Sequence, residues 1–206
     1  MVKFNISNTN LTSLVGVTFP KNVKKLYCSY NKLTNLEGCP SSVTMLDCQN
    51  NQLTNLEGCP SSIKSLYCDY NQITSLKGCP SSLKNLYCTN NKITSLKGCS
   101  SSIHTLICSH NRITSLEDCP PSVNKLRYIH YNYLNSEYNG KSVEEIHKIN
   151  KIKAYRKGIL KLNSIIFPTI IQRWYRYHYY DKLNSDGISL FCLRSIEADR
   201  KSGILI

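Results

Sequence analysis

A 20-residue repeat fills the first two thirds of the chain and constrains its fold more than any other feature. The repeat returns as Leu26-Tyr27-Cys28, Leu46-Asp47-Cys48, Leu66-Tyr67-Cys68, Leu86-Tyr87-Cys88 and Leu106-Ile107-Cys108. A unit this short cannot bury its own apolar face, so its copies must stack and share one core. We therefore expect a repeat solenoid whose outer surface is free to bind a partner.

Apolar residues alternate around each Leu-x-Cys triplet, which is the period of a short strand with one buried face. Stacked copies place these strands side by side in a parallel sheet. An asparagine follows each strand cysteine by three residues, where the chain must turn, at Asn31, Asn51, Asn71, Asn91 and Asn111. Its amide can satisfy the backbone groups that such a turn leaves without partners. The return segments carry Gly and Pro, which favour an extended, non-helical course.

The pattern Leu-x-x-Leu-x-Cys-x-x-Asn-x-Leu-Thr-x-Leu resembles the leucine-rich repeat in its short 20-residue form, over about residues 4–136. Short repeats of this kind are similar to those of bacterial effectors and of giant-virus repeat proteins. The Lys, Asn and Ile bias and the cysteine columns look more like the viral group. The resemblance implies a curved scaffold with strands on the concave face, mostly extended segments on the convex side, and protein recognition as its use.

Imperfect copies flank the array, as expected of capping units. The apolar positions of the first copy are Phe4, Ile6, Leu11 and Leu14. Thr9 replaces asparagine in this copy, and two extra residues precede Pro20. Residues 126–134 form a degraded last copy, in which a one-residue insertion brings Asn132 to the asparagine column.

From Ser142 onward the apolar spacing becomes helical, and Ser142 with Glu145 forms a capping box. We predict a helix up to a connector that starts at Asn163, and a second helix from Pro168 to about Leu183. The first helix is predicted to seal the open end of the sheet as a C-terminal cap. The predicted domains are the solenoid, residues 1–136, and a basic helical region, residues 137–206.

Charge and cysteine content limit the function classes. The net charge is +13, and residues 141–206 hold 13 of the 26 basic residues. Binding of nucleic acid or of an acidic membrane surface through this tail is therefore the alternative to a solvated helix face. Ten of the 11 cysteines occupy two repeat positions, where free thiols behave as small hydrophobes. Their spacing matches no metal site, so neither a metal nor a cofactor is predicted.

The sequence has no apolar segment long enough to cross a bilayer and no leader-like start. We predict an intracellular, cytoplasmic protein, in the host cytoplasm if the chain is viral, with the nucleus left open. We predict a monomer.

Residues that alternate with the buried Leu and Cys must point out of the sheet, so the sequence predicts the binding face. Its central column is Tyr27, Asp47, Tyr67, Tyr87, Ile107 and Arg127, with Gln49, Asp69 and Thr89 beside it. Tyrosine supplies large, rigid contacts that are enriched at the energetic centres of interfaces. The competing interpretation is that these tyrosines only cover the sheet.

A second candidate site is a basic aromatic segment in the predicted second helix. Residues 171–176 resemble the opening of an IQ motif, the calmodulin-binding helix. The residues that carry the resemblance are Ile171, Gln172, Trp174 and Arg176. Tyr177 and Asp181 depart from that motif, and packing of Trp174 onto the cap competes with binding of a calmodulin-like partner.

No catalytic constellation is found in the sequence. Bacterial effectors with similar repeats can carry a ubiquitin-ligase domain with a nucleophilic cysteine. Here the only thiol outside the repeat positions is Cys192, which has apolar neighbours and Arg194 where that family has an acid. We therefore predict a non-enzymatic scaffold that binds a protein through its concave face.

Overall fold

The computed structural model describes residues 1–128, 132 and 134–163. By its internal contacts the chain forms two compact units, residues 1–152 and 153–206. The predicted boundary at residue 136 stays a prediction, and the helix up to Ile152 belongs to the first unit. The predicted second helix, the IQ-like segment and Cys192 lie outside the described residues.

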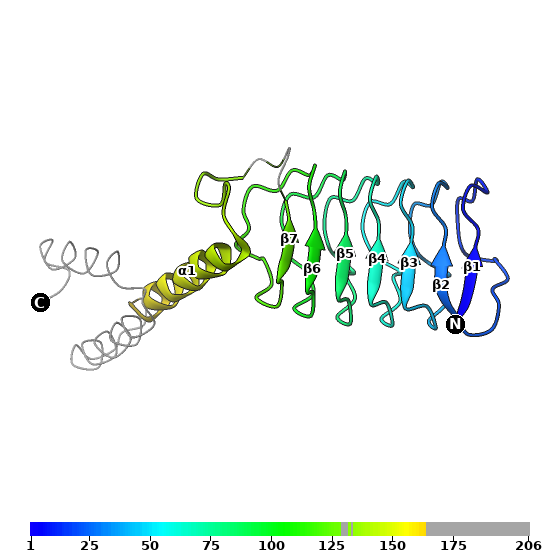
Figure 1. The fold of residues 1–206 in the computed structure, drawn as a ribbon, viewed down its shortest axis with the longest axis horizontal. Helices are drawn as coiled ribbons and strands as arrows, with labels where there is room; N and C mark the ends of the chain where they lie inside the picture. Colours follow the sequence, from blue (N-terminus) through cyan, green and yellow to red (C-terminus); the bar gives the residue numbers. More distant parts are fainter. Residues whose placement is uncertain (129–131, 133, 164–206) are drawn as a thin grey trace, which may run out of the picture. The chain divides into compact units, whose positions relative to one another are not determined.

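Seven parallel strands form one sheet, in which neighbours in sequence are neighbours in space (Figure 1). They are β1 (Val2–Asn5), β2 (Val23–Tyr27), β3 (Met45–Asp47), β4 (Ser65–Tyr67), β5 (Asn85–Tyr87), β6 (Thr105–Ile107) and β7 (Lys125–Arg127). From β2 onward each residue pairs with the residue 20 positions later, as Leu26 does with Leu46. The 20-residue period is therefore one coil of a leucine-rich-repeat solenoid, and the predicted fold class is confirmed.

The core is a set of columns that run through the coils. The strand Leu and Cys and the apolar residues of the return path are almost fully buried in every coil from the second to the sixth. The return segments between residues 28 and 124 contain turns and extended chain but no helix. This matches the predicted non-helical side, because a return path this short leaves no room for a helix.

The asparagine column joins each coil to the one before it. The Nδ2 of Asn71 donates to the carbonyl oxygens of Cys68 and Cys48, each at 3.1 Å, and its Oδ1 accepts the N–H of Leu53 at 3.0 Å. Asn51 and Asn91 repeat the same three contacts in their own coils. One side chain thus satisfies buried backbone groups on two coils, as the sequence predicts.

The first coil differs from the later coils in its spacing and in the residue at the asparagine position. Phe4 pairs with Leu26 in the sheet, 22 residues apart, which accommodates the two extra residues. Thr9 stands at the asparagine position, and its hydroxyl donates to the carbonyl of Ile6 at 2.7 Å. Phe4 also packs edge to face on Phe19, with ring centroids 5.7 Å apart.

The last coil replaces its buried cysteine by Tyr128, whose hydroxyl lies 2.7 Å from the carbonyl oxygen of Lys141. Asn132 occupies the asparagine column despite the insertion, since its Nδ2 donates to the carbonyl of Cys108 at 3.1 Å. Its Oδ1 accepts the N–H of Ile113 at 3.1 Å. The predicted end of the ladder is therefore confirmed.

Helix α1 (Val143–Asn163) follows the last coil. Ser142 and Glu145 form the predicted capping box: the Ser142 N–H donates to the Glu145 carboxylate at 2.8 Å, and its Oγ accepts the Glu145 N–H at 3.2 Å. The first turns of the helix pack on the solenoid through Ile146, which is fully buried. Asn150 donates to the carbonyl of Leu116 at 2.7 Å and accepts the hydroxyl of buried Tyr138 at 3.0 Å. These contacts provide the predicted C-terminal helical cap.

The ten described cysteines carry free thiols that belong to the core or its edge. In the inner column the thiols of Cys28, Cys48, Cys68 and Cys88 lie against a carbonyl oxygen of the next coil, as Cys68 does with Tyr87 at 3.3 Å. Burial raises the pKa of the Cys48, Cys68 and Cys88 thiols well above the ordinary value. At the outer column burial raises the pKa of Cys39 to about 12. These thiols are therefore protonated and unreactive at neutral pH.

Replacing Asn71 by alanine tests the asparagine column. The change leaves several buried backbone groups without partners, at a cost of about 1–3 kcal/mol for each group. We expect the free energy of unfolding to fall by at least about 2 kcal/mol, measured by urea denaturation followed by circular dichroism. The matched control is Gln52→Ala, one residue after a ladder asparagine but exposed. Equal stability of the two variants would show that the column does not hold the coils together.

Alkylation tests the burial of the inner thiols. Iodoacetamide reacts with the thiolate, and a raised pKa leaves little thiolate in the folded state. At pH 8 we expect Cys48, Cys68 and Cys88 to react more than about a hundredfold more slowly in the folded protein than in urea. Peptide mass spectrometry resolves the individual sites. Reaction of Cys68 at the same rate in both states would contradict its place in the core.

Candidate protein-binding face

The outward side of the sheet presents the residues that alternate with the buried Leu and Cys. In β4, for example, Leu66 is fully buried while Ser65 and Tyr67 are partly exposed. We call this surface the strand face: the outward residues of β2–β7 and the residue that follows each strand cysteine. It is the predicted concave face of the solenoid.

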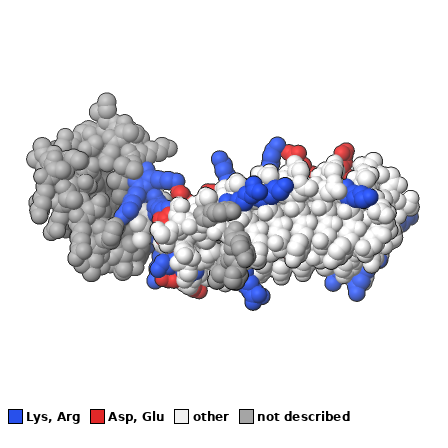
Figure 2. Space-filling view, turned by 90° about the horizontal axis from the view of Figure 1, so that it is seen from above, with Lys and Arg blue, Asp and Glu red and all other residues white. Residues whose placement is uncertain are grey.

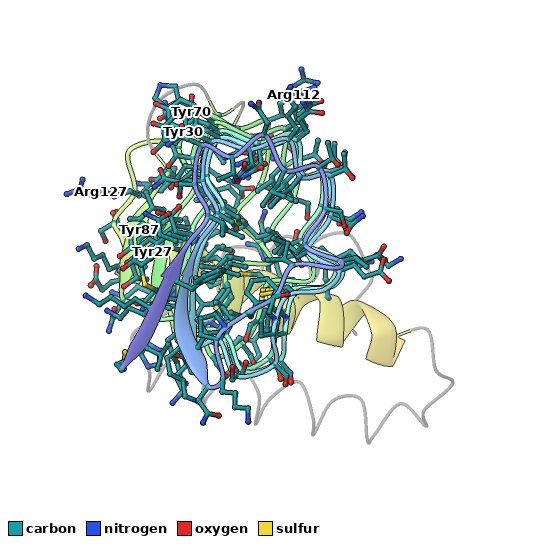
Figure 3. The ribbon with its side chains drawn as sticks, turned by 90° about the vertical axis from the view of Figure 1, so that its right-hand side faces the viewer. Tyr27, Tyr30, Tyr70, Tyr87, Arg112 and Arg127 are labelled. Carbon is teal, nitrogen blue, oxygen red and sulfur yellow. The ribbon has the colours of Figure 1, made fainter. Side chains whose placement is uncertain are left out.

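The strand pairing brings the six predicted central residues into one column. Tyr27 pairs with Asp47, Asp47 with Tyr67, and the same register continues through Tyr87, Ile107 and Arg127. Figure 3 looks along the solenoid and shows Tyr27, Tyr87 and Arg127 projecting from the sheet, away from the core. All but Arg127 are partly covered by their neighbours, and Arg127 is exposed.

Two tyrosines of this column stack on each other. The rings of Tyr67 and Tyr87 are 4.5 Å apart between centroids and within 9° of parallel. Partial burial raises the pKa of the Tyr67 hydroxyl, and the neighbouring Tyr87 adds to the effect. The stack fixes the orientation of both rings, so the column offers a preorganised aromatic surface.

The second column carries the polar groups. Gln49 donates from Nε2 to the Asp47 carboxylate at 3.2 Å, and Asp69 accepts the backbone N–H of Thr89 at 2.7 Å. Burial raises the pKa of the Asp69 carboxyl, although the hydrogen bonds from Thr89 act in the opposite direction. The three predicted residues of this column therefore lie beside the tyrosines.

Two exposed tyrosines that are not among the predicted site residues border the face. Tyr30 and Tyr70 are 58% and 56% exposed and have φ of +54° and +55°. This left-handed conformation is unusual for a bulky side chain. Asn50 and Asn90 adopt it at the same position of their coils. The sequence signal is an aromatic residue directly before a ladder asparagine, at a turn position that suits Asn or Gly. Figure 3 shows Tyr30 and Tyr70 close to one another in projection, beyond the ends of the strands.

On the side of the solenoid seen in Figure 2, charged side chains are spread along the surface. Figure 2 shows Lys and Arg in small groups with broad uncharged surface between them, on the side seen there.

No group of three or more His, Cys, Asp or Glu residues within the described ranges could hold a metal ion. Among the helices that the structure describes, none is both long and apolar enough to cross a membrane.

A hollow of about 440 Å³ lies on the return side, between the coils that contain β4 and β5. It is lined by Thr74, Ser75, Lys77, Thr94, Ser95, Lys97 and Gly98. The coils pack more loosely here than near Gly58. A Cβ atom added to Gly98 would lie 3.3 Å from the nearest atom of the preceding coil, whereas a Cβ atom added to Gly58 would lie 2.6 Å from it. No predicted site residue lines this hollow, so it is separate from the strand face.

Known proteins resemble this chain only at the level of structure. No known family profile and no curated protein matches it. The solved structures that resemble it include YopM from Yersinia enterocolitica WA-314, at 24% identity and a TM-score of 0.45, over 57% of this chain and 31% of that chain. A Shigella effector leucine-rich-repeat domain shares 24% identity over 66% of this chain and 72% of that chain, with a TM-score of 0.43.

The functional domain of InlJ from Listeria monocytogenes, which includes a cysteine ladder, shares 21% identity over 65% of this chain and 42% of that chain, with a TM-score of 0.35. This chain thus spans less than a third of the YopM chain and less than half of the InlJ chain. The leucine-rich-repeat solenoid is accordingly assigned on the strand register and the asparagine column of the chain itself.

Proposed function

We propose that this chain is a non-enzymatic scaffold that binds a protein partner through the strand face. The observation that carries the proposal is the stacked pair Tyr67 and Tyr87 in the middle of a partly exposed column. Buried tyrosines at the centre of an interface contribute a large share of binding energy, and here their orientation is set before the partner arrives.

The composition of the face supports a protein partner. Tyr27, Tyr67 and Tyr87 supply aromatic area, while Asp47 and Gln49 supply hydrogen-bonding groups at its side. This mixture of rigid aromatic residues and short polar residues is typical of protein-binding surfaces. Arg127 and Ile107 extend the column toward the C-terminal cap and belong to the proposed contact surface.

A rigid support also favours recognition. Backbone bonds between strands and the amides of Asn71 and Asn91 hold neighbouring coils in one register. Little conformational entropy is then lost when a partner binds. The described thiols, whose pKa values are raised by burial, are poor nucleophiles, which supports a role without catalysis.

We further propose an intracellular, monomeric protein of viral type. Its many buried free thiols suit a reducing compartment such as the host cytoplasm. The basic C-terminal region is the second candidate, for nucleic acid or an acidic surface, because half of the basic residues lie in residues 141–206. The calmodulin-type segment with Ile171, Gln172, Trp174 and Arg176 remains a prediction.

Photo-crosslinking tests the use of the strand face. A benzophenone amino acid is placed at Ser109, on the strand face, or at Thr54, exposed on the return side. After irradiation in cells, we expect a discrete crosslinked protein from position 109 and none from position 54. Tyr67→Ala with Tyr87→Ala should weaken capture of that protein by roughly thirtyfold or more, as expected for two central tyrosines.

The control for the double variant is Thr34→Ala, which changes an exposed side chain on the return side. Both variants are first compared by thermal unfolding, so that loss of the fold is not mistaken for loss of contact. Crosslinking from position 54 alone, or unchanged capture by the double variant, would show that the strand face is not the binding surface.

Salt dependence separates the two candidate functions. Binding centred on tyrosines should change little between 50 and 500 mM salt, whereas binding of nucleic acid by the tail should fall steeply. The measurement compares the full chain with a chain that ends at residue 163, which keeps the described cap. Steep salt dependence that disappears on truncation would support the tail and contradict the proposed function.

A further inference from the structure

The strand face places one carboxylate between two aromatic side chains. Asp47 pairs with Tyr27 on one side and with Tyr67 on the other, so the three side chains lie in one row. Neighbouring strands are about 4.8 Å apart, which puts the Cα atoms of the two tyrosines about 10 Å from one another. Tyr87 stacks on the far side of Tyr67 and leaves the Tyr67 face that is turned toward Asp47 uncovered by that stack.

The carboxylates of this face have no cationic partner within the described part of the chain. The ion pairs there join Lys77 to Glu57 and Lys141 to Glu145, both away from the strand face. Asp47 instead receives long contacts from Gln49, at 3.2 and 3.3 Å. This is unexpected in a protein of net charge +13, where basic side chains are twice as frequent as acidic ones.

A second acid of the strand face, Asp69, is partly buried. Asp69 follows Tyr67 by two residues and lies 20 residues after Gln49, at the same position of the next coil. Burial raises the pKa of its carboxyl, so the folded chain disfavours the charge that this side chain carries at neutral pH. A cation bound nearby would offset that cost. Both acids thus lie at the centre of the proposed binding surface without a counter-charge.

We propose that Asp47, Tyr27 and Tyr67 form a site for an arginine side chain of the protein partner. The inference rests on the proposed function and specifies the chemistry that the strand face recognises. The guanidinium stacks against the tyrosine rings while its N–H groups donate to the Asp47 carboxylate, and Asp69 adds negative potential beside it.

A guanidinium fits this arrangement better than an ammonium. It is planar, and a flat group with ring contacts of about 3.5–4 Å on each side needs roughly 7–8 Å between the rings. That space is compatible with tyrosines on strands two positions apart. Guanidinium is also less strongly hydrated than ammonium and can donate two parallel hydrogen bonds to one carboxylate. A lysine ammonium would lose more hydration free energy on binding, and its N–H groups would match the geometry of the carboxylate less well.

Basic residues on the strand face and at its edge restrict where such a cation can bind. Lys25 precedes Tyr27 by two residues, and Arg127 ends the central column three coils beyond Tyr67. Lys64 and Lys84 are exposed at the N-terminal ends of β4 and β5. A cationic group is therefore repelled along the edges and attracted at the acidic centre, which selects for register as well as for charge.

The test uses small probes on the full chain, so that no partner has to be known. Nα-acetyl-arginine amide is titrated while the aromatic resonances of the tyrosines are followed by NMR. We expect saturable shifts at Tyr27 and Tyr67, with a dissociation constant in the millimolar range for one exposed cation. Nα-acetyl-citrulline amide has nearly the same shape without the charge, and Nα-acetyl-lysine amide has the charge without the plane. Both should bind more weakly.

The variants locate the site. Asp47→Asn keeps the size of the side chain and should weaken binding of the arginine probe by about fivefold, the magnitude of one exposed ion pair. Glu37→Gln removes an exposed acid on the return side and is the matched control, with no change expected. Equal binding of the citrulline or lysine probe, or an Asp47→Asn variant that binds like the parent, would overturn the arginine site.

Failure of the arginine site and failure of the proposed function give different experimental outcomes. Crosslinking from Ser109 reports on the strand face whatever side chain the partner presents. If the crosslink forms but the arginine probe does not bind at Asp47, the face still recognises a protein and the arginine site is wrong. If the crosslinked partner is captured less well by Asp47→Asn but equally well by Glu37→Gln, both proposals are supported.

Discussion

The asparagine column links each coil of the solenoid to the coil before it, and the stacking of the coils depends on it. A 20-residue coil has too small an interior to satisfy its own turn, because the backbone at the end of each strand faces the core. Asn71 resolves this by bonding to carbonyl oxygens of its own coil and of the preceding coil at the same time. The contact that closes one turn therefore also fixes the distance and register between two turns.

The ends of the solenoid follow from the same requirement. The first coil carries Thr9 at the asparagine position, and the hydroxyl of Thr9 bonds within its own coil. At the other end the strand cysteine gives way to Tyr128, whose hydroxyl reaches the segment before α1, and Asn150 then bonds from the helix to the last full coil. Side chains thus supply hydrogen bonds in the first and the last described coils.

This construction leaves the strand face free to vary. Leu66, Cys68 and Asn71 carry the core packing and the ladder hydrogen bonds, so the outward residues between them are available for recognition. On the central coils they combine a tyrosine stack with two carboxylates that lack a counter-charge in the described structure. Both proposals depend on the division, within each coil, between buried residues that hold the fold and outward residues that can contact a partner.

The sequence by itself determined the solenoid, the columns of Leu, Cys and Asn, the capping box at Ser142 and the outward position of the six central residues. These follow from periodicity, because a constant period places equivalent residues in register whatever their detailed contacts. The tertiary structure alone decided that Tyr67 and Tyr87 stack, that Tyr30 and Tyr70 stand exposed in left-handed conformations, and that Asn150 bonds to Leu116. Ring orientation, turn conformation and contacts between distant segments depend on how the side chains pack in space, and a linear repeat does not encode these as a pattern.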